Sequence, residues 1–254
     1  MDHQYLSLSR DVQGLVVGYL GYQEHCVLIA QCGWNMRCLL PHAKYIEEHL
    51  PRYTPDIVEW ILQNVTKVDP SVQDNNALRV ASFCGYAEVV GLLLTDPRVD
   101  PSAQDNYAIK LASECGCVGV VGLLLADPRV DPGVENNHAI RWASRMGHTE
   151  VIELLLADPR VDPSVGDNDA IQRVSEKGHT ETVRLLLADP RVDPSTQDNY
   201  AIRFASKQGH TETVRLLLAD PRVDPGARDN EALRWAIDEE RAGVVVVLKA
   251  RMCV

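Results

Sequence analysis

Three histidines recur along the sequence and are the first residues to consider for metal chemistry. His148, His179 and His210 are spaced 31 residues apart. A zinc site needs ligands that converge on one point at about 2 Å. Histidines that recur one repeat apart lie side by side instead, so we expect them to stabilise turns and we predict no metal site.

The seven cysteines are the next candidates for chemistry. Their number is odd and the sequence contains no CxxC pair, which argues against both a disulfide framework and a zinc site. A Gly-rich phosphate loop, an HExxH motif and a Ser-His-Asp arrangement are equally absent from the sequence. We therefore expect reduced thiols and a protein that is not an enzyme, with no catalytic residues and no cofactor.

The charge balance limits the classes of partner. The chain of 254 residues carries 36 acidic and 25 basic side chains, a formal net charge of −11, so phosphate backbones and anionic membranes should repel it. The start of the chain does not resemble a secretory signal. The longest apolar run, Val118 to Ala126, is shorter than the roughly 18 residues that span a bilayer. We expect a soluble, cytoplasmic monomer that binds neither nucleic acid nor membranes.

An internal repeat decides the architecture. The segment DPRVDP occurs five times, 31 residues apart, beginning at Asp96, Asp127, Asp158, Asp189 and Asp220. A fixed period of this size indicates supersecondary units that cannot bury an apolar face alone and must stack on their neighbours. The sequence therefore predicts a solenoid.

Local patterns within one unit predict a helix, a turn, a second helix and a loop. Asn137 is expected to cap a helix from His138 to Arg145 by accepting from a first-turn amide. Gly147 suits the left-handed residue that ends a helix. Thr149 is expected to cap the second helix, which runs to Ala157, and the Asp-Pro pair that follows ends it.

The segment Gly147 to Ala157, GHTEVIELLLA, resembles the second half of an ankyrin repeat, and Ala139-Ile140-Arg141 matches the slot of that family's Thr-Pro-Leu-His helix start. The resemblance covers about Asp56 to Val254, although the period is 31 where the family has about 33. It implies an all-α, ankyrin-type solenoid of about six helix-turn-helix units over residues 51–254. It also implies that the first helices line a concave groove that binds a protein target.

Residues 1–50 do not follow the period. The segment Leu8 to Leu20 resembles the first helix of an F-box. That resemblance implies a contact with the small adaptor subunit of a cullin ubiquitin ligase through Leu8, Val12, Val16, Tyr19 and Leu20. The alternative is a small helical module that only caps the array.

Three positions of the first helices vary from unit to unit, and their spacings of four and three residues place them on one face. The groove residues predicted from this pattern are Tyr107, Leu111, His138, Trp142, Arg145, Asp169, Arg173, Tyr200, Phe204 and Lys207. The alternative is that the middle of the three positions packs between units; this middle row consists of Val80, Leu111, Trp142, Arg173, Phe204 and Trp235. Arg173 in that row favours an open surface, because an unpaired buried cation is costly.

These features predict a protein-protein interaction module. With the F-box resemblance, we expect a substrate receptor of a cullin-type ubiquitin ligase that binds its target in the ankyrin groove. The alternative is an ankyrin scaffold or inhibitor with no link to a ligase.

Overall fold

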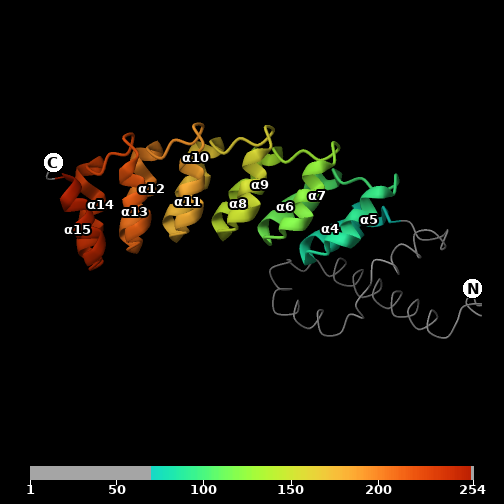
Figure 1. The fold of residues 1–254 in the computed structure, drawn as a ribbon, viewed down its shortest axis with the longest axis horizontal. Coiled ribbons are helices and arrows are strands. Elements are labelled where there is room, and N and C mark those ends of the chain that lie inside the picture. The colour runs from blue at the N-terminus through green and yellow to red at the C-terminus, as the bar shows by residue number, and fades with distance from the viewer. Residues whose placement is uncertain (1–69, 253–254) are drawn as a thin grey trace, which may run out of the picture. The chain divides into compact units, whose positions relative to one another are not determined.

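The computed structural model describes residues 70–252, which form twelve α-helices and no strand. The helices pair into six units that follow one another in chain order (Figure 1). The first helices are α4 (Val72–Cys84), α6 (Ala103–Glu114), α8 (Val134–Met146), α10 (Val165–Lys177), α12 (Thr196–Gln208) and α14 (Ala227–Asp238). The second helices are α5 (Ala87–Thr95), α7 (Val118–Ala126), α9 (Thr149–Ala157), α11 (Thr180–Leu187), α13 (Thr211–Ala219) and α15 (Ala242–Met252).

The N-terminal predictions fall on residues that the structure does not describe. They are the module over 1–50, its boundary with the array, and the adaptor contacts Leu8, Val12, Val16, Tyr19 and Leu20. Within the described array, no helix is both long enough and apolar enough to cross a bilayer.

The core repeats with the units. Each first helix packs against its own second helix and against the first helices of the neighbouring units. Ile140 of α8 and Ile152 and Leu155 of α9 are almost fully buried, and aliphatic residues at the matching positions of the other units are buried as well. Stacking therefore builds one continuous core that no single pair could bury alone.

A left-handed turn precedes the regular part of every first helix. Glu135, Asn136 and Asn137 all have φ between 50° and 56°, and the equivalent three residues of the other units are left-handed too. Such a conformation costs about 1 to 2 kcal/mol for a residue with a side chain, and least for Asn and Asp. Regular helical geometry consequently begins at His138, where the sequence predicted it.

The predicted capping role of Asn137 is wrong. Its side-chain oxygen accepts a 2.8 Å hydrogen bond from the backbone N–H of Asp162 in the next loop. The left-handed backbone turns the amide toward the next unit, so the side chain links two units and does not cap its own helix. Asn75, Asn106, Asn168 and Asn199 make the same bond.

The predicted role of Thr149 also needs correction. Gly147 ends α8 with a φ of 79°, as expected, but no side chain caps the start of α9. The Thr149 hydroxyl lies 2.8 Å from the Thr182 hydroxyl of α11 instead. A partner in the neighbouring unit thus replaces the local cap.

The recurring histidines join units at the turns. Nε2 of His148 lies 2.9 Å from the carbonyl oxygen of Glu114, and Nε2 of His210 lies 3.1 Å from that of Glu176. These carbonyls belong to the last turn of the first helix in the preceding unit, where no intrahelical donor is left. In the described part of the chain, no three His, Cys, Asp or Glu side chains are placed to hold a metal ion.

Candidate functional site

The variable positions of the first helices form one continuous surface, which we call the first-helix face. It is defined by Tyr107, His138, Trp142, Arg145, Asp169, Arg173, Tyr200, Phe204, Lys207 and Trp235, all of which reach solvent at least in part. Ala139, Ile140 and Ala143 lie between these positions on α8 and are buried. The helical period thus separates a core side from an open side, as expected.

Leu111 is the exception among the predicted groove residues. Only 4% of its surface is exposed, so it offers almost no surface to a partner. Arg173 occupies the equivalent position of α10, and its side chain remains 37% exposed. Ion pairs with Asp169 and Glu176 hold the Arg173 guanidinium at the surface.

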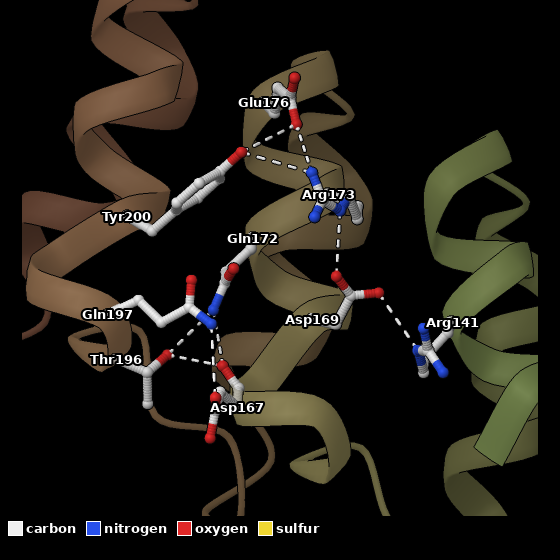
Figure 2. A network of polar contacts seen from close by, with 9 residues as sticks. All are labelled: Arg141, Asp167, Asp169, Gln172, Arg173, Glu176, Thr196, Gln197 and Tyr200. Carbon is white, nitrogen blue, oxygen red and sulfur yellow. Dashed lines mark hydrogen bonds and ion pairs between the residues drawn. The ribbon is translucent and has the colours of Figure 1, made fainter. Parts of the chain in front are cut away.

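A chain of ion pairs runs across the middle of the face (Figure 2). Nε of Arg173 lies 3.0 Å from Asp169, and Nη1 lies 3.0 Å from Glu176. The second oxygen of Asp169 lies 3.2 Å from Nε of Arg141 on α8. The Tyr200 hydroxyl of α12 is 3.3 Å from Nη1 of Arg173, so this network links three units.

The network shifts the pKa values of two of its members further from neutrality. Partial burial disfavours the charged form of Arg173, but Asp169, Tyr200 and Glu176 together outweigh that effect and raise the pKa of the guanidinium. Burial, with Glu176 close by, raises the pKa of the Tyr200 phenol. Arg173 is therefore a fixed cation and Tyr200 a neutral hydroxyl across the physiological range.

Aromatic rings continue the face toward the C-terminal units. The rings of Tyr200 and Phe204 stack with centroids 3.9 Å apart, and Trp235 of α14 meets Phe204 edge-on at 5.2 Å. A cavity of about 530 Å³ opens beside these three rings. The other residues that line it are Gln197, Asp198, Arg203, Arg228 and Glu231.

Arg203 lines this cavity and is only 4% exposed. Its Nε and Nη2 donate to the carbonyl oxygens of Asp198 and Gln197 at 2.8 and 3.0 Å, and its Nη1 pairs with Glu231 of the next unit. The side chain thus supplies hydrogen-bond donors to two carbonyl oxygens of the left-handed turn. Sequence reasoning missed this role, although a long polar residue at every equivalent position was the available signal.

Two cations of the face lie over indole rings. The Arg145 guanidinium is 5.2 Å from the Trp142 ring, and the Lys207 ammonium is 5.1 Å from the Trp235 ring. Within residues 70–252, neither cation has a carboxylate partner. All the predicted groove residues except Leu111 therefore reach solvent on one face, and Arg173 and Phe204 also contact the neighbouring unit.

Comparisons with known proteins confirm the ankyrin resemblance over part of the chain. Residues 170–252 match the model of three ankyrin-repeat copies, and residues 135–168 match the single ankyrin-repeat model. The fold is similar to that of an ankyrin repeat domain from Acinetobacter baumannii AYE, with a TM-score of 0.56, 19% sequence identity, and 70% of this chain and 98% of that chain covered. A search of curated proteins gave no match. The described array has the all-α fold of an ankyrin solenoid.

Proposed function

We propose that this array of ankyrin repeats is a protein-protein interaction module that binds its target on the first-helix face. The observation that carries the proposal is the row of half-buried Trp142, Arg173 and Phe204 across three successive first helices. Trp, Tyr and Arg are the residue types most enriched at binding hot spots. A folded chain leaves such side chains partly open where a partner can cover them.

The rigidity of the face supports the same proposal. Ion pairs hold Arg173, ring stacking holds Phe204, and the Arg145 guanidinium lies over the indole of Trp142. Side chains that are ordered before binding lose little conformational entropy when a partner arrives, so more of the contact energy appears as affinity. The role we propose for the chain itself is binding, without a catalytic step.

A more specific candidate is a substrate receptor for a cullin-type ubiquitin ligase. It rests on the resemblance of Leu8 to Leu20 to the first helix of an F-box. If it is correct, the full chain should co-purify with the small ligase adaptor, and changing Leu8 and Leu20 together to Ala should abolish that contact. A parent chain that does not retain the adaptor would leave the plain scaffold as the function.

The odd number of cysteines and the lack of a CxxC pair in the sequence favour a reducing location such as the cytoplasm. Among the described residues, Cys115 and Cys117 form no disulfide. Burial, with the nearby Cys117 and Glu114, raises the pKa of the Cys115 thiol to about 12. Such a thiol is a poor nucleophile at neutral pH and fits a packing role better than a redox role.

The binding proposal can be tested by capture from a eukaryotic extract with three forms of the full chain. These are the parent, the double variant Trp142→Ala with Phe204→Ala, and the control Leu123→Ala. Leu123 is a 37% exposed apolar residue on the second helix α7. We expect the parent and the control to retain the same proteins and the double variant to lose them. Equal retention by all three forms would contradict the proposal.

A further inference from the structure

Over the stretch from α8 to α12, the first-helix face carries more positive than negative charge. Both carboxylates of the central network are engaged, because Asp169 pairs with Arg141 and Arg173 while Glu176 pairs with Arg173 and accepts from Tyr200. The cations Arg145 and Lys207, which have no carboxylate partner in the described array, stand on either side of this network.

This surplus runs against the character of the whole chain, whose formal net charge is −11. Lysine and arginine favour the last turn of a helix because of its dipole, and that accounts for a cation at this position. It does not account for the location of each cation over an indole ring on the open face. The positions equivalent to Arg145 and Lys207 carry acidic residues in α6 and α14, namely Glu114 and Asp238. The excess of positive charge therefore ends on both sides of the stretch from α8 to α12.

The aromatic cavity adjoins one of the two cations. Trp235 lines the cavity and also lies beneath the Lys207 ammonium. The charged groups of the cavity neutralise one another, since Arg203 pairs with Glu231 and Arg228 pairs with Asp198 at 3.0 Å. What the cavity offers a ligand is therefore the apolar surface of Tyr200, Phe204 and Trp235.

We propose that the partner is an acidic protein segment with a bulky apolar side chain. The apolar side chain enters the cavity between α12 and α14, and carboxylates of the segment pair with Lys207 next to the cavity and with Arg145 two units away. This inference rests on the proposed function and adds the chemistry of the target. A basic segment would meet unpaired cations, which costs affinity. Nucleic acid would supply anions but is repelled by the net charge of the chain.

The experiment selects peptides from a phage-displayed library of natural protein segments, with the full chain as bait. Selections run in parallel on the parent, on Arg145→Glu with Lys207→Glu, and on a control with the same change of charge on the other helices. The control is Arg184→Glu with Arg215→Glu, two exposed residues of α11 and α13 whose only ion pairs are with Glu181 and Glu212 among the described residues. Trp142→Ala is a fourth bait that tests whether binding uses the face at all.

We expect the parent to enrich segments rich in Asp and Glu around one large apolar residue. The Arg145 and Lys207 variant should bind those peptides at least about tenfold more weakly, whereas the Arg184 and Arg215 control should keep their affinity. Thermal unfolding of each bait checks that it is folded. If the Glu substitutions unfold the chain, Arg145→Gln with Lys207→Gln takes their place, with a smaller loss of affinity expected.

The other outcomes separate this inference from the proposed function. Neutral or basic segments that bind the parent but not Trp142→Ala would overturn the acidic partner and leave the face as a binding site. Equal binding of acidic segments to the Arg145 and Lys207 variant would also overturn it. A selection in which binding depends neither on Trp142 nor on Arg145 and Lys207 would contradict both.

Discussion

The side-chain oxygen of Asn168 lies 2.7 Å from the backbone nitrogen of Asp193, a residue of the following unit, and accepts its hydrogen bond. Asn168 itself is left-handed, with a φ of 61°. Replacing it by Ala leaves the Asp193 N–H without its partner, at about 1 to 3 kcal/mol, and adds about 1 to 2 kcal/mol for a left-handed Ala. We therefore expect Asn168→Ala to be strongly destabilising in urea unfolding.

The Gly variant separates these two contributions. Asn168→Gly removes the acceptor but adopts the left-handed conformation freely, so it should lose less free energy of unfolding than Asn168→Ala. If Asn168→Gly were as stable as the parent, the bond between units would contribute nothing.

A buried serine hydroxyl in each of the first five units should contribute nothing to the stability of the fold. Ser175 of α10 is fully buried, and its Oγ has no hydrogen-bond partner among the described residues. Removing an unsatisfied buried hydroxyl is neutral or stabilising by up to about 1 kcal/mol. We expect Ser175→Ala to match or exceed the parent in chemical unfolding. The control Ser195→Ala should lose stability, because the Ser195 hydroxyl donates to Asp193 at 2.7 Å.

Among the second helices α7, α9, α11 and α13, we expect α7 to be the least stable. Gly119 and Gly122 lie inside it, and each costs about 1 kcal/mol relative to Ala. A Cβ at Gly122 would meet only Leu154 at 4.0 Å, whereas one at Gly119 would lie 3.3 Å from Ala87 Cβ. Gly122→Ala should therefore stabilise the chain by up to about 1 kcal/mol, and Gly119→Ala by less.

Hydrogen exchange measures this weakness directly. In the parent, amides from Val120 to Leu125 should exchange faster than those from Ile152 to Leu156, and Gly122→Ala should narrow the difference. Equal protection of the two segments in the parent would show that the glycines do not weaken the unit.

His179 should make stability depend on pH. Burial lowers its pKa, although a hydrogen bond to the Arg145 backbone opposes the shift. The unfolded chain then binds a proton more readily than the folded chain, so the free energy of unfolding falls as the pH drops below about 6.5. Denaturation curves between pH 7 and pH 5 should show a smaller fall for His179→Gln than for the parent. If the free energy of unfolding fell equally for the parent and for His179→Gln, His179 would not contribute to the pH dependence of stability.

Local rules predicted the elements but not the bonds between units. The bounds of α9, Thr149–Ala157, agree with the prediction because a glycine turn and an Asp-Pro pair delimit it. The partner of Asn137 lies 25 residues away in the sequence, and only the stacking of units brings the two together. Glu135 adopts a left-handed conformation, which residues with a long side chain rarely do, so the local sequence could not predict it.

In the candidate site too, the sequence predicted what helix periodicity decides and missed what depends on packing between units. The i, i+4 and i+7 spacing placed His138, Trp142 and Arg145 correctly on one face. It left open whether the middle of the three positions faces solvent or packs between units, and Leu111 is buried there because burial depends on what the neighbouring side chains cover. The cavity beside Trp235 was also missed, because it exists only between two units.

The central claim is that the first-helix face binds a protein. The most direct test is the dissociation constant of a captured partner, measured by calorimetry against the parent, Trp142→Ala and Leu123→Ala. A hot-spot tryptophan contributes at least about 2 kcal/mol, so Trp142→Ala should weaken binding by about thirtyfold or more while Leu123→Ala leaves it unchanged. A partner that binds Trp142→Ala as tightly as the parent, and loses affinity only with Leu123→Ala, would show that the second helices form the interface and would contradict the account.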